Sequence, residues 1–273
     1  MKISKKIQTR IINGLKTYAK IAEDQKSRDV AEADTVTLVK DIMADCFGYD
    51  KYSELTSEQQ IRGTYCDLAV KLQNKIKFLI EVKSAGIDLN DSHIRQAVNY
   101  GANEGIEWIV LTNSIDWKLY RIKFAQPIDF EEVSSFNIIE FDGKNEDELK
   151  KVFLLCKEGL TIDAMESFHQ QAQILNKHTI AEIIKSDAVI SVVRREFRKL
   201  FPDIKIEVAD IQDLLANDIL KREVNDGDKA KEAVSLVKKT SRKIERKKAK
   251  EQAKKAQEDS KPGRSEPDGA GNA

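Results

Sequence analysis

Residues 61–84 hold two apolar runs that meet at a polar turn, and they read IRGTYCDLAVKLQNKIKFLIEVKS. With Asn74 at the centre of the turn, Leu72 faces Ile76, and every second pair beyond it is apolar. One face of such a hairpin packs against a core while the other face carries polar side chains. The stretch therefore predicts a β-hairpin that anchors a sheet.

The polar face of this hairpin brings two carboxylates together. The same register sets Asp67 opposite Glu81, and Lys83 follows two residues later on the same face. Opposed side chains lie about 5 Å apart, where two negative charges repel by about 3 kcal/mol at an effective dielectric constant of about 20. Either one carboxyl is protonated or a divalent cation lies between them, and oxygen ligands favour Mg²⁺ or Mn²⁺ over Zn²⁺.

An Asp, a Glu and a Lys that converge in this way suit metal-assisted hydrolysis of a phosphodiester bond. Asp67 and Glu81 would hold a metal ion that polarises the scissile phosphate and lowers the pKa of a bound water. Lys83 would position or activate that water, or stabilise developing negative charge. The simpler alternative is an amphipathic hairpin in which Glu81 and Lys83 form an ordinary surface ion pair.

Apolar periodicity on both sides of the hairpin predicts an α/β domain over residues 1–144, with a mixed central sheet flanked by helices. Its strands are expected near 56–61, 65–72, 76–83, 106–112 and 115–122, and its helices near 5–22, 30–47 and 91–104. Helical periodicity near 145–157, 161–175, 179–201 and 208–222 then predicts a small helical region over residues 145–225. Residues 226–273 are basic and poor in large apolar side chains, so we expect a largely disordered tail there.

The predicted helix near 91–104 gathers polar side chains on one face. At 100° per residue, His93, Gln96, Tyr100 and Asn103 lie together, away from the apolar face. If the apolar face packs on the sheet, Gln96 and Tyr100 reach the edge of the site, where they would orient the lysine, a carboxylate or the DNA backbone. His93 falls in the first turn of this helix, and no role is expected for it.

The order of these motifs resembles the PD-(D/E)xK nuclease superfamily, and it is most similar to the N-terminal nuclease domain of type I restriction endonuclease R subunits. The resemblance rests on Asp67, on Glu81-Val82-Lys83, on Gln96-Ala97-Val98-Asn99-Tyr100 and on Trp108-Ile109-Val110-Leu111-Thr112-Asn113. It implies a restriction-endonuclease-like core and catalytic roles for Asp67, Glu81, Lys83, Gln96 and Tyr100. Cys66 stands where the nominal motif of the superfamily has proline.

A further acidic residue enters through the same resemblance. The stretch Glu32-Ala33-Asp34-Thr35 resembles the Glu-containing start of the helix that precedes the core in that family. The resemblance implies that Glu32 is an auxiliary ligand of the metal or of a water molecule. Acidic side chains at a helix start also complement the helix macrodipole, which is the competing explanation. Glu54 and Glu58 compete with Glu32 for the same role.

From these motifs we expect a Mg²⁺- or Mn²⁺-dependent endonuclease that hydrolyses DNA in a restriction or anti-phage defence system. A type I R subunit continues into a helicase motor, but this sequence has no Gly-x-x-x-x-Gly-Lys-Ser/Thr phosphate loop. A separate ATPase motor or methyltransferase subunit is therefore an expected partner, and the need for two active sites in double-strand cleavage makes a homodimer plausible. The alternatives are a non-catalytic or partner-dependent nuclease-fold subunit that binds nucleic acid, and a structural or RNA-associated protein.

The formal net charge of zero conceals a strongly basic segment. Between Lys229 and Lys255 the chain carries 12 Lys or Arg residues against 3 Asp or Glu residues. The candidate nucleic-acid-binding residues in this segment are Lys238, Lys239, Arg242, Lys243, Arg246 and Lys247. A solvated segment that keeps the protein soluble explains the same composition equally well.

The rest of the composition excludes several other classes of protein. The three cysteines, Cys46, Cys66 and Cys156, are widely spaced and predict neither a disulfide framework nor a zinc site. No apolar stretch approaches the roughly 18 residues of a membrane span, and the first residues lack the apolar region of a secretory signal. We therefore expect a cytoplasmic protein that does not enter the membrane.

Overall fold

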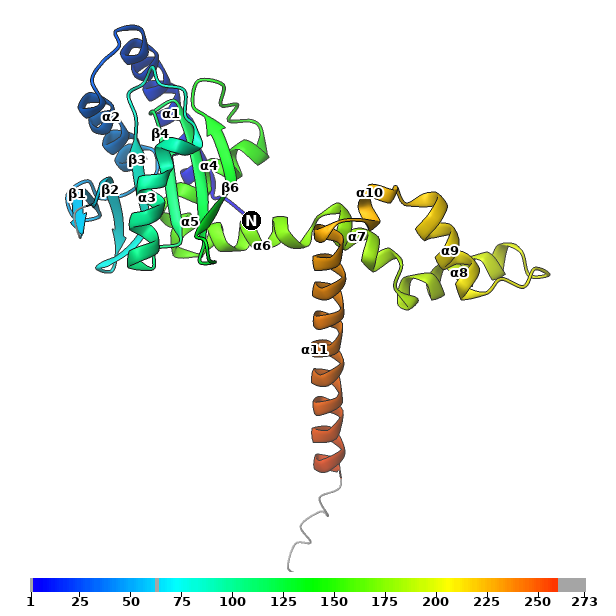
Figure 1. Ribbon diagram of the computed structural model, residues 1–273. Helices are drawn as coiled ribbons and strands as arrows, with labels where there is room; N and C mark the ends of the chain where they lie inside the picture. The colour runs from blue at the N-terminus through cyan, green and yellow to red at the C-terminus, as the bar shows by residue number, and fades with distance from the viewer. Residues whose placement is uncertain (1, 62–63, 260–273) are drawn as a thin grey trace, which may run out of the picture. The chain divides into compact units, whose positions relative to one another are not determined.

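The computed structural model describes residues 2–61 and 64–259, and it gives only the backbone of residues 58–61, 64–65, 248 and 250–259 (Figure 1). The chain divides into two compact units that meet between His169 and Gln170. We call the part up to His169 the first unit and the part from Gln170 onward the second unit.

A six-stranded mixed sheet forms the centre of the first unit. Its strands follow each other in chain order, and every neighbouring pair is antiparallel except β3 and β4, which are parallel. The strands are β1 (Leu55–Ile61), β2 (Thr64–Leu72), β3 (Lys75–Val82), β4 (Trp108–Thr112), β5 (Asp116–Lys123) and β6 (Asp129–Asn137). The mixed α/β architecture is confirmed, but the sequence analysis did not predict β6.

Helices cover both faces of this sheet, as Figure 1 shows. One face carries Ile80 and Val82 and packs against α1 (Lys5–Ser27), α2 (Glu32–Asp45) and α4 (Glu146–Leu155). The other face carries Leu79 and packs against α3 (Asp91–Glu104). This alternation confirms that Ile80 and Val82 point into the core on the α1, α2 and α4 face, while Leu79 points toward α3.

The register of the β2–β3 hairpin matches the expectation except beside the turn. Leu68 pairs with Ile80 as predicted, but Leu72 pairs with Lys75, so the predicted partnership of Leu72 with Ile76 is wrong. Both central residues of the turn have positive φ, 53° at Gln73 and 61° at Asn74, as a two-residue hairpin turn requires. An irregularity between Val70 and Lys71 restores the register for the rest of the hairpin.

The first unit extends beyond the predicted boundary at residue 144. Val152, Phe153 and Leu155 of α4 are buried in the core that α1 and α2 share with the sheet. The short helix α5 (Lys157–Thr161) and the start of α6 (Ala164–Ile174) add Leu160 and Met165 to the same core. Because these side chains complete one face of the sheet, the helices from residue 146 to residue 169 belong with the sheet and not with the later helices.

The second unit consists of helices. They are α7 (Lys177–Ile184), α8 (Asp187–Leu200), α9 (Val208–Leu214), the π-helical turn η1 (Leu215–Ile219), α10 (Arg222–Asn225) and α11 (Asp228–Asp259). The long α11 lies against α7 and buries Ala230 and Ala233. Disorder was expected from residue 226, but residues 228–259 are helical, since Ala, Lys, Glu and Gln are strong helix formers. The expectation for residues 260–273 lies outside the described residues.

The helices of the described part of the chain include none that is both long and apolar enough to cross a membrane.

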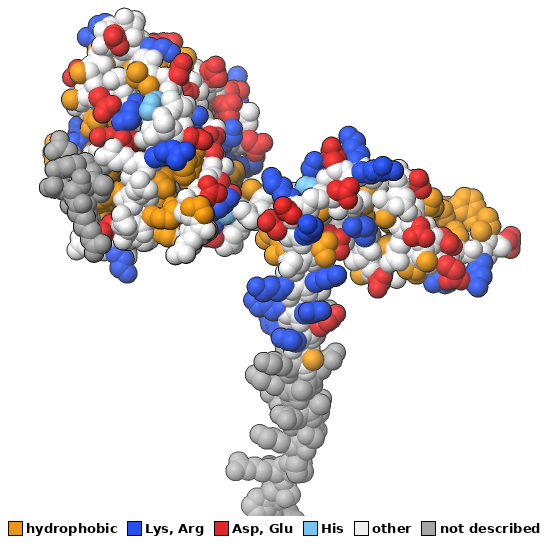
Figure 2. All heavy atoms as spheres, viewed as in Figure 1, with side chains coloured by type: hydrophobic (Ala, Val, Ile, Leu, Met, Phe, Trp, Pro, Cys, Tyr) orange, Lys and Arg blue, Asp and Glu red, His pale blue; other side chains and the backbone are white. Residues whose placement is uncertain are grey.

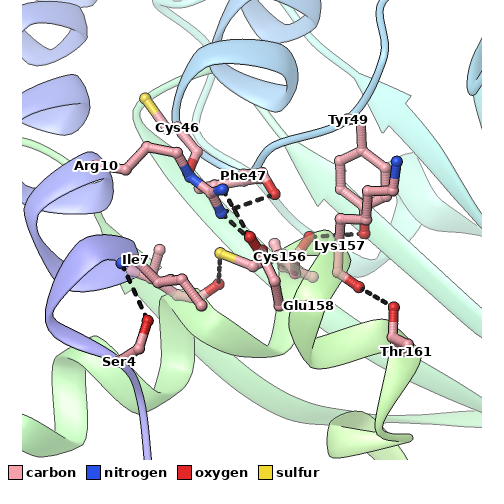
Figure 3. Close-up of polar contacts among 12 residues, drawn as sticks. Ser4, Ile7, Arg10, Cys46, Phe47, Tyr49, Cys156, Lys157, Glu158 and Thr161 are labelled. Carbon is pink, nitrogen blue, oxygen red and sulfur yellow. Dashed lines mark hydrogen bonds and ion pairs between the residues drawn. The ribbon is translucent and has the colours of Figure 1, made fainter.

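Within the first unit, Arg10 joins three helices (Figure 3). Its Nε atom donates to the Cys46 carbonyl at 3.0 Å, and one Nη atom donates to the Phe47 carbonyl at 3.4 Å. The two Nη atoms also form a bidentate pair with the Glu158 carboxylate, at 2.7 Å each. Arg10 thus links α1 to the end of α2 and to the start of α5, and it satisfies carbonyl groups that the end of α2 leaves free.

Candidate active site

The three predicted residues of the hairpin meet at the end of β3. The ladder between β2 and β3 runs to Leu68 and Ile80, so Asp67 and Glu81 lie one residue further along each strand. Glu81 is only 6 % exposed. One Asp67 carboxylate oxygen accepts a hydrogen bond from the Val82 backbone N–H at 2.7 Å, which ties β2 to β3 at this point.

Lys83 directly follows the last residue of β3, and its ammonium group points toward the carboxylates of Glu81 and Glu32. Its backbone N–H donates to the Thr112 carbonyl of β4 at 2.8 Å, so its starting position is fixed by the sheet. Its Nζ atom lies 2.8 Å from Glu81 Oε1 and 3.5 Å from Glu32 Oε2. The structure therefore brings Glu32, at the first turn of α2, to the same ammonium group as Glu81.

The surroundings of Glu81 disfavour the ionised form of its carboxyl group. The pKa of Glu81 is raised to about 7, chiefly by burial and then by the nearby Asp67 carboxylate, and the Lys83 ammonium only partly opposes the two. Burial alone would lower the pKa of Lys83, but its contacts with Glu81 and Glu32 outweigh burial, and the pKa is raised. Lys83 consequently stays protonated near neutral pH and acts as a fixed positive charge.

The donor atoms of the site fit a hard divalent cation in kind. Carboxylate oxygens are the ligands that Mg²⁺ and Mn²⁺ prefer, and the raised pKa of Glu81 reflects a negative charge that a cation would relieve. The described side chains contain no group of three or more His, Cys, Asp or Glu residues arranged to hold a metal. One Asp67 oxygen accepts from the Val82 N–H, and Glu81 Oε1 accepts from Lys83.

Tyr100 does not lie where the sequence analysis expected it. The side chain is 1 % exposed and is buried in the apolar cluster between α3 and the sheet, and among the described side chains its hydroxyl has no hydrogen-bond partner. The prediction that Tyr100 belongs to the polar face was wrong, because Ala97 is buried too and widens the buried stripe of α3 toward Tyr100. Gln96 lies on the exposed side of α3, as expected.

The other acidic and histidine candidates have structural roles. His93 completes the capping box of α3, where its Nδ1 accepts from the Asn90 backbone N–H at 3.4 Å. Glu54 pairs with Lys157 at 2.6 Å and is therefore engaged elsewhere in the unit. The side chain of Glu58 lies outside the described residues.

Two buried residues near the site had no role in the site predicted from the sequence. The thiol of Cys66 is 1 % exposed, and its pKa is raised to about 12, chiefly by burial and then by the charge of Glu81. Asn113 is 3 % exposed, and its amide holds the segment that leaves Lys83. Asn113 ends the quoted Trp108–Asn113 motif, which was the only signal of its importance in the sequence.

The predicted nucleic-acid-binding residues belong to α11, in the second unit. Figure 2 shows Lys and Arg side chains gathered along the described part of this helix. The six residues are all exposed, and they are Lys238, Lys239, Arg242, Lys243, Arg246 and Lys247. They form a continuous basic surface of the second unit, whereas Asp67 and Glu81 belong to the first unit.

Comparison with known protein families identifies the segment that carries this site. Residues 42–136 match the family of the type I restriction enzyme R protein N terminus (HSDR_N). The matched segment contains Asp67, Glu81 and Lys83 and runs from the end of α2 almost to the end of β6, whereas Glu32 precedes it. The resemblance stated from the motifs is thereby confirmed. No curated protein and no solved structure matches the chain.

Proposed function

We propose that the first unit is a metal-dependent endonuclease that hydrolyses DNA phosphodiester bonds in a restriction or anti-phage defence system. The observation that carries the proposal is the buried Glu81 beside the partly buried Asp67, with the Lys83 ammonium 2.8 Å from Glu81. The family match supports it, since the matched segment contains these three residues. We also propose an ATPase motor or a methyltransferase subunit as a partner, since the matched family is that of a restriction enzyme subunit.

The chemistry divides between the metal and the side chains. A bound Mg²⁺ or Mn²⁺ would supply Lewis acidity toward the phosphate and lower the pKa of a bound water. Asp67 and Glu81 would hold the cation, and the proximity of Glu32 to Lys83 makes Glu32 a candidate auxiliary ligand. Lys83, which is protonated, would stabilise the negative charge that develops on the phosphate oxygens. Gln96, exposed on α3, would contact the DNA backbone.

The test is a cleavage assay on supercoiled, linear, branched and single-stranded DNA and on RNA, with Mg²⁺ or Mn²⁺. The wild-type chain is expected to cut at least one DNA substrate, and Asp67→Ala is expected to abolish cutting. Glu54→Gln is the matched control, because Glu54 is also an acidic residue of the first unit but pairs with Lys157. Cleavage that is equal in wild type and Asp67→Ala would refute the proposal.

A second candidate function is a partner-dependent subunit that binds nucleic acid without cutting it. The second unit favours this version, since its exposed apolar side chains include Ile174, Leu175, Leu200, Phe201 and Ile219. Isolation of the chain from its native host decides between the two. A stable complex with an ATPase or methyltransferase, together with no cleavage by the chain alone, supports the partner-dependent version.

A further inference from the structure

We propose that Asn113 is a positioning residue for the candidate active site, where its amide fixes the segment that leads from Lys83 to α3. This inference rests on the proposed function. The segment, residues 83–90, has no helix or strand of its own, and it begins at the lysine of the site. Its end, Asn90, is the N-cap of α3, the helix that carries Gln96. Whatever holds this segment therefore holds two elements of the site.

Asn113 holds the middle of that segment. Its Nδ2 atom donates to the Ile87 carbonyl at 2.8 Å, and the side chain is almost completely buried. The Ile87 N–H in turn donates to the Ser84 carbonyl at 3.0 Å, so the tethered carbonyl belongs to a formed turn. Because this hydrogen bond is partly buried and its donor side chain is almost fully buried, it restricts the backbone more than a fully exposed one does.

The same side chain is anchored on the sheet by its other end. Asn113 Oδ1 accepts from the backbone N–H groups of Ile115 at 3.1 Å and Asp116 at 2.7 Å, which closes the turn between β4 and β5. Asn113 directly follows Thr112, whose carbonyl accepts the Lys83 N–H. The amide thus connects the rigid end of β4 to the segment beyond Lys83.

This combination of contacts requires both atoms of an amide. An oxygen must face two N–H groups while a donor faces a carbonyl, and of the short side chains only asparagine supplies both in this geometry. Aspartate would keep the turn but would place a carboxylate against the Ile87 carbonyl. A second tether reaches the same segment from β5, where Lys118 Nζ donates to the Leu89 carbonyl at 3.4 Å.

The chain supplies a matched control for the alternative that Asn113 merely closes a turn. Asn137 Oδ1 accepts from the N–H groups of Ile139 at 2.8 Å and Glu140 at 3.1 Å, and its Nδ2 donates to Asp116. It therefore closes a turn in the same way, but no contact described for it reaches residues 83–90. Asn113→Ser and Asn137→Ser both keep an oxygen that can serve the turn, and both lose the amide donor without adding charge.

The experiment measures kcat and KM for DNA cleavage, together with amide hydrogen exchange. Asn113→Ser is expected to lower kcat by about 10-fold or more, with KM within about twofold, because small displacements of catalytic groups reduce rates strongly. Exchange at Ile87 and its neighbours is expected to accelerate. Asn137→Ser should change neither quantity. Lys118→Met should also lower kcat, by a smaller factor. Because Lys118 is partly exposed, this variant tests the tether even if the buried Asn113→Ser variant does not fold.

Two results would overturn the proposal. One is a kcat for Asn113→Ser equal to that of Asn137→Ser, and the other is unchanged exchange in residues 84–90. If the wild-type chain cleaves no substrate, the proposed nuclease function fails instead. In that case accelerated exchange confined to Asn113→Ser still supports the tether, so the two failures are distinguishable.

Discussion

Glu81 lies in an environment that differs strongly from that of an ordinary exposed carboxylate. It is buried at the end of β3, beside Asp67, and its pKa is raised to about 7 against an unfolded value of about 4.3. In the folded protein Glu81 therefore keeps its proton between about pH 4.5 and pH 7, where the unfolded chain has lost it. A group of this kind reduces stability as the pH rises through that window, which is the reverse of an ordinary ion-paired carboxylate.

A titration of stability tests this reading of Glu81. The free energy of unfolding of the wild-type chain should fall relative to that of Glu81→Gln between pH 5 and pH 8, by up to about 3 kcal/mol. The amide mimics the protonated carboxyl at every pH, so the difference isolates ionisation. Urea unfolding at both pH values, without divalent ions, provides the measurement. A difference that is the same at pH 5 and pH 8 would show that Glu81 titrates normally.

Tyr100 offers a second test at the residue scale. Its motif implies a catalytic role, whereas its burial in an apolar cluster implies none. Its hydroxyl is buried with no partner in the part of the chain that the structure describes, and a buried polar group without a hydrogen bond costs roughly 1–3 kcal/mol. Tyr100→Phe should therefore leave stability unchanged or raise it by about 1 kcal/mol, and should leave cleavage within about twofold of wild type. Unfolding curves and cleavage rates of the two proteins check this. A large loss of cleavage by a stable Tyr100→Phe protein would restore a catalytic role for the hydroxyl.

At the scale of elements, strong periodicity made the hairpin, the flanking helices and the site predictable. The strand period of two sets Glu81 and Lys83 on one face and Ile80 and Val82 on the other, and the structure has this arrangement. Glu32 entered only through the resemblance, because nothing in the sequence says which helix end meets β3. Tyr100 was wrongly assigned to the polar face of α3, because the buried stripe of this helix also includes Ala97 and is wider than the periodicity indicates.

Other elements carry too weak a local signal to predict. β6 is an edge strand whose side chains are only partly buried, so its sequence lacks the apolar alternation of a core strand. The role of Asn113 depends on Ile87, 26 residues away, and a contact at that separation leaves no periodic trace. The helical state of α11 follows from helix propensity, whereas its low apolar content pointed to disorder.

The Arg10 contacts between α1, α2 and α5 predict a clear effect on stability. Arg10→Met removes a bidentate pair and two hydrogen bonds to carbonyls, and because the pair is partly exposed we expect a loss of about 2 kcal/mol. Arg28→Met is the matched control, since Arg28 makes an exposed pair with Asp24 and should lose less than about 0.5 kcal/mol. Urea unfolding compares the two variants, and equal losses would contradict the structural role given to Arg10. Cleavage by the folded Arg10→Met protein should be unchanged.

At the scale of the whole molecule, α11 concentrates the positive charge of a chain with no net charge. If its six exposed basic residues bind DNA phosphates, each neutralised phosphate contributes a slope of about −0.9 to the logarithmic dependence of affinity on salt. Truncation after residue 226 should then flatten that dependence by several units and leave any sequence preference unchanged. Binding isotherms of both proteins at several salt concentrations measure the slopes. Superimposable slopes would make α11 a solubility segment or a site for a protein partner.

The central claim is that Asp67 and Glu81 share a divalent cation in a nuclease active site. Anomalous diffraction from crystals of the wild-type protein soaked in Mn²⁺ tests it most directly, with Asp67→Ala crystals soaked in parallel. The account predicts a manganese peak within coordination distance of both carboxylates in the wild type, at roughly 2.0–2.4 Å from an oxygen of each, and none in Asp67→Ala. Wild-type crystals that hold no manganese between Asp67 and Glu81, at a Mn²⁺ concentration that supports cleavage in solution, would contradict it.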